Sequence, residues 1–174
     1  LLVACEKAAE GGRLLTVEPE MVTYAQQMGA SGNLGFVAGD RISVEDALYL
    51  INYRSDTISC LMIAKYVAGS EAAFVELMNE KARSMGLTNT HFVNTTGLHD
   101  ANHYTTCREM AAIMTCAMNN KVASKILTSY TGKSIGIYDA NKVKYRNPTA
   151  YAGWYSDRLG DNQNKVSGTD ITII

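Results

Sequence analysis

The chain has 174 residues, of which 47% are hydrophobic, so it can bury a sizeable core and is not a disordered chain. The 16 Lys and Arg residues nearly balance the 17 Asp and Glu residues, and a net charge of −1 argues against nucleic acid or an anionic membrane as the main partner. The length suits one domain or a large part of one, and no apolar run approaches the roughly 18 residues of a membrane span.

The first third of the chain predicts two helices separated by irregular structure. Residues 1–10 read as a helix that ends at the Gly11-Gly12 pair. Four glycines interrupt residues 14–42, where we expect loops with short strands. A helix is expected over residues 43–54, because Ser43 and Asp46 form a capping-box pattern and apolar residues recur at helical spacing behind them.

The middle of the chain predicts a central helical body. Residues 56–68 are apolar almost all round, which indicates a buried central helix, with either Ser55 or Asp56 as its N-terminal cap. Ser70 caps a further predicted helix that Gly86 ends.

A mixture of elements is expected after that body. Residues 89–94 read as a strand and residues 95–104 as a polar loop. Two more helices follow, over residues 108–120, behind a capping box of Thr106 and Glu109, and over residues 122–130.

The pattern then changes to short alternating runs. Residues 133–139 and 142–148 flank Ala140-Asn141 and predict a β-hairpin, and residues 170–174 are rich in β-formers. Helices followed by a hairpin and a further strand indicate an α+β fold rather than repeating βαβ units.

Local motifs for chemistry are sparse. Cys5, Cys60 and Cys116 lie in apolar, helix-like contexts and are expected to be buried free thiols. His99, His103 and Cys107 are the best candidates for a metal site, but the residues between the two histidines favour a turn, so we expect no metal and no cofactor. Ser55 alone reads more simply as a helix cap than as a nucleophile, since no histidine is arranged beside it as a base.

Several blocks, taken in order, resemble one family. Residues 35–57 (GFVAGDRISVEDALYLINYRSDT) resemble a segment that leads into a Ser-x-Asn motif. Residues 68–100 (AGSEAAFVELMNEKARSMGLTNTHFVNTTGLHD) are the most specific block, and HYTTCREMA and YRNP resemble its continuation. The family is the low-molecular-weight penicillin-binding proteins, the serine-type D-alanyl-D-alanine carboxypeptidases.

The resemblance implies a catalytic domain of which this chain holds the interior. Family members combine Ser-x-x-Lys, Ser-x-Asn and Lys-Thr-Gly motifs around one cleft, and only the second has a counterpart here. We therefore expect residues 1–174 to form a single partial domain, the mostly helical interior of a β-lactamase/DD-peptidase-like fold. The first and third motifs are expected just outside Leu1 and Ile174, in the same polypeptide or in a companion chain, with both ends close to Ser55.

The resemblance also implies roles for particular residues. Ser55 matches the family serine that relays a proton, and Thr57 stands where the family has Asn, with one hydroxyl in place of an amide. Gly97 and Leu98 resemble a turn that walls the cleft, and Arg146 resembles a cation near the substrate carboxylate.

The implied function is D-Ala-D-Ala carboxypeptidase activity through an acyl-enzyme. The expected substrate is a peptidoglycan stem peptide, the expected inhibitors are β-lactams, and the expected location is the cell envelope, outside the cytoplasm. Two alternatives stay open. In the first, the protein would be a catalytically weak binder of cell-wall peptide, which Thr57 suggests. In the second, it would be a β-lactamase relative, since Ser-Asp-Thr resembles Ser-Asp-Asn.

Overall fold

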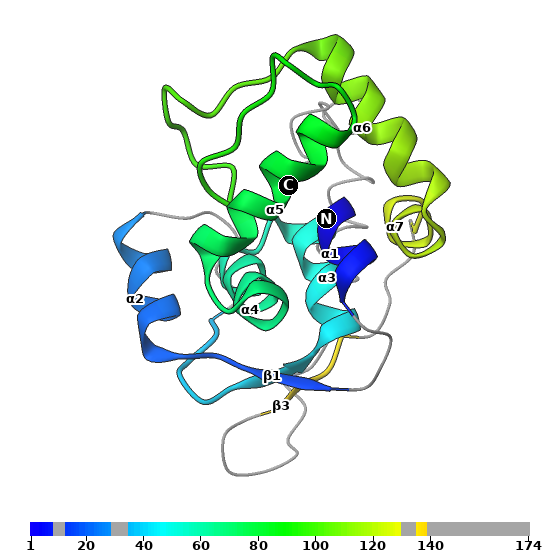
Figure 1. The fold of residues 1–174 in the computed structure, drawn as a ribbon. Coiled ribbons are helices and arrows are strands. Elements are labelled where there is room, and N and C mark those ends of the chain that lie inside the picture. Colours follow the sequence, from blue (N-terminus) through cyan, green and yellow to red (C-terminus); the bar gives the residue numbers. More distant parts are fainter. Residues whose placement is uncertain (9–12, 29–34, 130–134, 139–174) are drawn as a thin grey trace, which may run out of the picture.

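The computed structural model describes residues 1–8, 13–28, 35–129 and 135–138. Helices dominate these residues, and three short strands accompany them (Figure 1). In chain order the elements are α1 (Leu2–Lys7), β1 (Leu14–Thr16), α2 (Pro19–Gln27), β2 (Arg41–Ser43), α3 (Val44–Arg54), α4 (Thr57–Ala68), α5 (Glu71–Ser84), α6 (Cys107–Asn119), α7 (Lys121–Leu127) and β3 (Ile137–Tyr138). The predicted α+β class, mostly helical, is confirmed.

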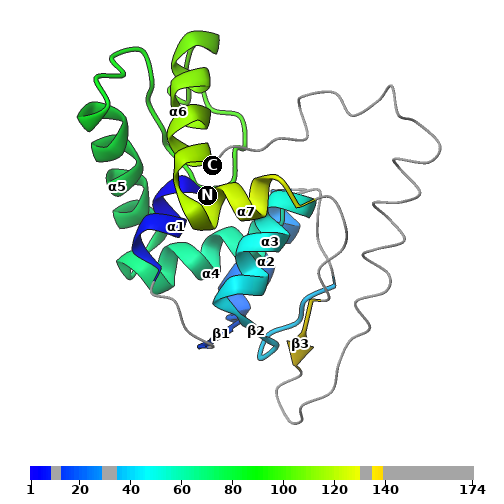
Figure 2. The ribbon, with the colours of Figure 1, turned by 90° about the vertical axis from the view of Figure 1, so that its right-hand side faces the viewer.

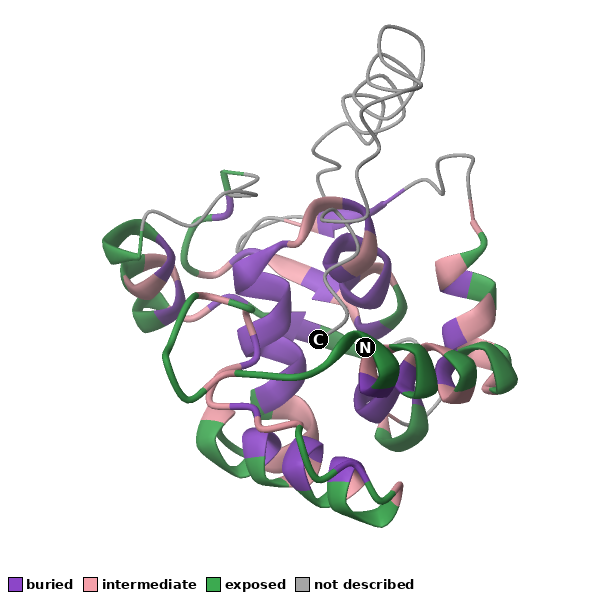
Figure 3. Cartoon of the chain, turned by 90° about the horizontal axis from the view of Figure 1, so that it is seen from above, coloured by how far each residue is buried: buried purple, intermediate pink, exposed green. Residues whose placement is uncertain are grey.

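The helix α4 forms the centre of the fold. It contacts α1, α2, α3, α5 and the strand β1, and Figure 1 shows these elements arranged around it. Every residue from Thr57 to Ala64 is buried, as the apolar sequence predicts. In Figure 3 the buried residues concentrate on the central helices, and exposed residues cover the outer sides.

A small antiparallel sheet closes one side of the helical body. Its strand order is β1-β2-β3, with Leu15 opposite Ile42 and Ile42 opposite Ile137. Ile42 is fully buried, so its side chain joins the sheet to the helical core. The strand β2 runs directly into α3, where the side chain of Ser43 accepts a hydrogen bond from the Asp46 amide at 3.0 Å, which confirms the predicted cap.

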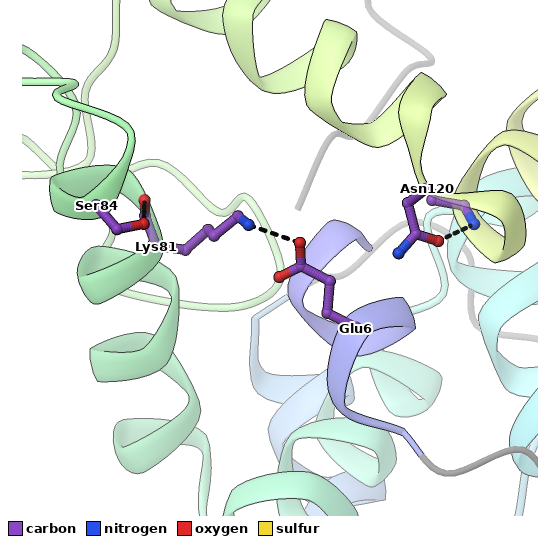
Figure 4. Close-up of polar contacts among 5 residues, drawn as sticks. Glu6, Lys81, Ser84 and Asn120 are labelled. Atoms are coloured by element: carbon purple, nitrogen blue, oxygen red, sulfur yellow. Dashed lines mark hydrogen bonds and ion pairs between the residues drawn. The ribbon is translucent and has the colours of Figure 1, made fainter.

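Ion pairs fix two short helices against the larger ones. Lys81 of α5 reaches Glu6 of α1, with 2.6 Å between Nζ and Oε1 (Figure 4). Lys65 of α4 pairs with Glu18 at the start of α2. Figure 2 shows α1 above α4, between α5 and α7, where its apolar face packs on several helices at once.

The sequence prediction missed one helix. Residues 19–27 were expected to be irregular, but they form α2. Pro19 occupies the first turn, where its missing amide hydrogen is no loss, and Met21 and Ala25 lie one turn apart on the buried side. The two short strands expected in this region are present as β1 and β2.

The predicted strand over residues 89–94 was wrong. Only an isolated bridge between His91 and Tyr104 forms there. The side-chain amide of Asn79 donates a hydrogen bond to the Phe92 carbonyl and accepts one from the Phe92 amide, each at 2.8 Å. Phe92 therefore bonds to a helix side chain instead of a neighbouring strand. Of the predicted hairpin, only residues 135–138 fall within the described residues, and β3 forms within them. The remainder of the hairpin and residues 170–174 lie outside the described residues.

Among the described residues no single helix is long and apolar enough to cross a membrane, although α4 and α5, bent by 80° from each other, meet those criteria as a pair.

Replacing Asn79 with Ala should destabilise the full-length protein by about 2–4 kcal/mol, because both backbone groups of the buried Phe92 would lose their partner. Chemical denaturation at pH 7 measures this. Glu80→Ala, at an exposed position of the same helix, should change the free energy of unfolding by less than about 0.5 kcal/mol. Equal effects of the two substitutions would contradict the assignment.

Candidate active site

The candidate site centres on the junction between α3 and α4. Ser55 ends α3, and its amide donates to the carbonyl of Ile51 at 3.1 Å. Its backbone is left-handed, with φ 49° and ψ 42°, and it is the only residue other than glycine with a positive φ in the described part of the chain. A left-handed conformation costs an L-residue roughly 1–2 kcal/mol, so this turn holds a strained serine between two packed helices.

The cap of α4 is Asp56 rather than Ser55. One carboxylate oxygen of Asp56, Oδ2, accepts a hydrogen bond from the Ser59 amide at 2.7 Å. Asp56 is 0% exposed, whereas Ser55 is half-buried. The structure thus decides between the two caps that the sequence allowed. Ser55 lies outside α4 as the link between the two helices.

Thr57, the second candidate catalytic residue, begins α4. Its side chain is only 5% exposed, so it belongs to the buried first turn of the helix. Ser55 and Thr57 are separated by one residue but differ in exposure. Ser55 lies on a partly exposed turn, and Thr57 lies at the edge of the core.

Burial controls the ionisation of the groups at this junction. It raises the pKa of Asp56 to about 6, while the hydrogen bond from the Ser59 amide and the charge of Arg54 act in the opposite direction. Burial also raises the pKa of the Cys60 thiol to about 12 and that of Cys5 to about 11, so both thiols are neutral at physiological pH. Cys5 and Cys60 are the buried free thiols that the sequence predicted; Cys116 is also free but only half-buried.

The start of the described chain lies next to this junction. The backbone nitrogen of Leu1 lies within electrostatic range of Cys60, in the first turn of α4, and of Cys5. The helices α1 and α4 pack against each other from there (Figure 2). The N-terminal end of α1 therefore lies near the beginning of α4.

The turn at Gly97 and Leu98 is shaped by one side chain. The side-chain oxygen Oδ1 of Asn94 accepts hydrogen bonds from the backbone amides of Thr96 and Gly97. The side-chain nitrogen Nδ2 of Asn94 donates to the Leu98 carbonyl at 2.9 Å. Gly97 has φ 73°, a conformation that favours glycine. These bonds hold the turn in one conformation.

Glu71 anchors the same turn to the start of α5. Its Oε1 atom accepts bonds from the Thr95 amide at 3.0 Å and from the Thr95 hydroxyl at 2.8 Å, and Thr95 is only 2% exposed. The Glu71 carboxylate also acts on the pKa of Cys60, so the anchored turn lies within electrostatic range of the first turn of α4. The sequence did not single out Glu71, because nothing local to it indicates this role.

The ends of the loop between α5 and α6 are also fixed. The Glu109 carboxylate accepts bonds from the amide and the side chain of Asn89, at 3.0 Å each, and from the Thr90 hydroxyl. The bond from Thr90 is the largest of the effects that hold the pKa of Glu109 below its ordinary value. Thr106 accepts from the Glu109 amide, which confirms the predicted cap of this helix.

The remaining candidates lie apart from the junction or outside the described residues. Arg146 is outside them. His103 packs edge-on against Phe92, with ring centroids 5.5 Å apart, while His99 and Cys107 are exposed. In the described ranges no three metal-ligating side chains lie close enough together to hold a metal ion.

Sequence comparison identifies relatives along most of the chain. A sequence model of the family described as D-alanyl-D-alanine carboxypeptidase matches residues 7–159. The D-alanyl-D-alanine carboxypeptidase DacF of Bacillus subtilis is 28% identical over 95% of this chain, and DacC of Escherichia coli is 35% identical over 54% of it. The chain spans about a third of the length of DacF, 36%, and 26% of DacC.

Solved structures share the fold. The DD-transpeptidase of Streptomyces K15 superposes with a TM-score of 0.73 at 20% identity, over 84% of this chain and 58% of that one. The D-alanyl-D-alanine carboxypeptidase DacD of Francisella tularensis gives a TM-score of 0.59 at 24% identity, over 72% of this chain and 31% of that one. The predicted DD-peptidase-like fold is confirmed.

Replacing Glu71 with Ala should release the turn and speed hydrogen exchange at the Thr95 amide by at least about tenfold, because a bond to a carboxylate contributes about 1.5–3 kcal/mol. Exchange measured by NMR or mass spectrometry tests this in the full-length protein. Glu76→Ala, at an exposed position of α5, is the matched control and should leave Thr95 unchanged. Unchanged exchange in the Glu71 variant would show that the turn is held by other contacts.

Glu109→Gln should lower the melting temperature most at neutral pH. The folded-state pKa of Glu109 is below its ordinary value, so its stabilisation is fully present above about pH 4.5 and is lost as the pH falls through the folded pKa. The difference between wild type and variant should therefore shrink below pH 4. Thermal melts from pH 3 to 8 measure it, with Glu76→Gln as control, and a difference that is constant with pH would contradict the role of the charge.

Proposed function

Because this chain belongs to the D-alanyl-D-alanine carboxypeptidase family, we propose that the protein containing it removes the terminal D-alanine from peptidoglycan stem peptides through a serine acyl-enzyme. β-Lactams would acylate the same serine. The site would face outside the cytoplasm, in the cell envelope where this substrate lies. The observation that carries the proposal is the position of Ser55, on a strained and partly exposed turn beside the capped start of α4.

In the proposed reaction, bonds and protons balance in two steps. A serine hydroxyl, supplied by chain outside residues 1–174, attacks the carbonyl between the two D-alanines while a lysine beside it takes the hydroxyl proton. Ser55 passes that proton to the leaving nitrogen, the C–N bond breaks and D-alanine departs. Water then hydrolyses the ester and regenerates the serine. Acid–base help of this kind contributes about 10²–10⁴-fold.

The other residues would hold the substrate. Thr57 would offer one hydroxyl near the relay, and the turn at Gly97 and Leu98 would form a wall of the cleft. Arg146 would pair with the substrate carboxylate. The Asn94 and Glu71 contacts support the second of these roles, because a wall that is fixed before binding loses little freedom when substrate binds.

A second candidate function is binding of cell-wall peptide with slow turnover. Thr57 favours it, because its buried side chain has less reach than the family's asparagine. Under this alternative the protein would hold a D-Ala-D-Ala peptide without releasing D-alanine.

Labelling of the full-length protein with a fluorescent penicillin tests the proposal. Wild type should be labelled covalently and should release D-alanine from a D-Ala-D-Ala peptide. Ser55→Ala should reduce the acylation rate by about 10²–10⁴-fold with little change in melting temperature, because it removes the relay hydroxyl and keeps the backbone bond from residue 55 to Ile51.

Ser84→Ala is the matched control, since it removes a hydroxyl from an exposed helix end, and it should be labelled at the wild-type rate. Wild-type labelling in the Ser55 variant would refute its role as a relay. Peptide binding by the wild type without labelling or D-alanine release would favour the slow binder.

A further inference from the structure

Two buried polar atoms beside the proposed relay have no hydrogen-bond partner in the described residues. They are Oδ1 of Asp56 and Oγ of Ser59. Both residues are 0% exposed. A buried carboxyl group with one satisfied oxygen is expensive to keep ionised, so its retention at this position needs a reason.

Asp56 directly follows Ser55, the residue with the strained left-handed backbone. The turn at Ser55 must connect the end of α3 to the start of α4, and these two helices pack against each other. The end of α3 is fixed by the bond from the Ser55 amide to Ile51. The start of α4 is fixed by the 2.7 Å bond from the Ser59 amide to Asp56. The backbone of Ser55 is therefore held from both sides.

We infer that Asp56 is a positioning residue, whose carboxyl group caps α4 and thereby holds the left-handed turn that directs the Ser55 hydroxyl. This inference rests on the proposed function, because it assigns a purpose to the direction of that hydroxyl. Asp56 itself does not touch the substrate. Its contribution is to keep the relay in place before substrate arrives.

Ionisation of Asp56 should modulate this role. An ionised carboxylate at a helix N-terminus accepts the amide bond more strongly than a neutral one. The group changes charge near pH 6, so the turn is held more firmly above that pH than below it.

Two buried thiols near this junction keep the same charge in this range. Burial raises the pKa of the Cys60 thiol on α4 and of the Cys5 thiol on α1, so both stay neutral. The charge of Arg54 on α3 lowers the pKa of Asp56, against the larger effect of burial. The elements packed against α4 carry further charged side chains: Glu6 and Lys7 on α1, Glu18 and Glu20 at α2, Glu45 and Asp46 on α3, and Glu71, Glu76, Glu80, Lys81 and Arg83 on α5. Of these, Glu71 acts on the pKa of Cys60, and Glu18 and Glu20 pair with Lys65.

The test measures acylation of the full-length protein by a fluorescent penicillin from pH 5 to 8, in wild type and Asp56→Asn. Asparagine keeps an oxygen for the Ser59 amide but is neutral at every pH, so it mimics protonated Asp56. The two rates should agree within about twofold at pH 5, and wild type should be about tenfold faster at pH 7.5, the difference between a charged and a neutral hydrogen bond. The dissociation constant of the non-covalent complex should not change, because Asp56 does not contact the ligand.

Asp40→Asn is the matched control. Asp40 is 1% exposed and its Oδ2 accepts from the Val37 amide at 3.0 Å, but it lies before β2, near the opposite end of α3 from Ser55. This variant should follow the wild-type pH profile. Asp56→Ser, which keeps a neutral cap, gives a second variant if the asparagine variant does not fold.

The outcomes separate the two proposals. A wild type that is not labelled refutes the proposed function. A labelled wild type with the same profile in the Asp56 variants refutes the inference alone. A rate reduced equally at every pH refutes the role of the charge and leaves only a structural cap.

Discussion

The fold depends on burying the start of α4 without leaving its first amide groups unsatisfied. An N-terminal turn leaves four N–H groups without partners inside the helix, and a buried amide without a partner costs about 1–3 kcal/mol. Solvent cannot supply the partner here, because every residue from Thr57 to Ala64 is buried. Asp56 supplies one from within the chain, at the cost of a carboxyl group whose pKa rises to about 6. Since α1, α2, α3, α5 and β1 all pack on α4, this cap influences the placement of most of the molecule.

Much of the helical architecture was predictable because its determinants are local. The caps by Ser43, Ser70 and Thr106 each join residues three apart, and that spacing is readable without knowledge of the fold. The apolar composition of residues 56–68 likewise predicts a buried helix wherever its neighbours lie. The helix α2 was missed because it is short and nearby glycines outweighed the weaker signal of Pro19, Met21 and Ala25.

The loop between α5 and α6 was not predictable in the same way. Its conformation depends on side chains far along the chain: Asn79 bonds 13 residues away, Glu109 20 and Glu71 24. In the sequence each of these residues is an ordinary polar position of a helix, and the alternation in residues 89–94 resembles a strand. For the candidate site, the sequence could name the Ser55–Asp56 pair but could not decide which residue caps α4. That decision depends on which side chain is buried, and burial is set by the packing of α3 against α4.

At Thr57, the need to fit a buried helix position competes with the need to reach a ligand. As the first residue of α4 it must fit a buried position, and a β-branched side chain that is 5% exposed packs there at the expense of reach toward a ligand. If Thr57 holds substrate less firmly than an asparagine would, more of the orientation must come from elements that are already rigid. The turn at Gly97 and Leu98 is such an element, because Asn94 and Glu71 fix it before any ligand binds. The Glu71 carboxylate also acts on the pKa of the buried Cys60, in the first turn of α4. In the proposed mechanism the preformed turn would orient the substrate and Ser55 would transfer the proton, and this division would persist when the residue two positions after the relay serine changes.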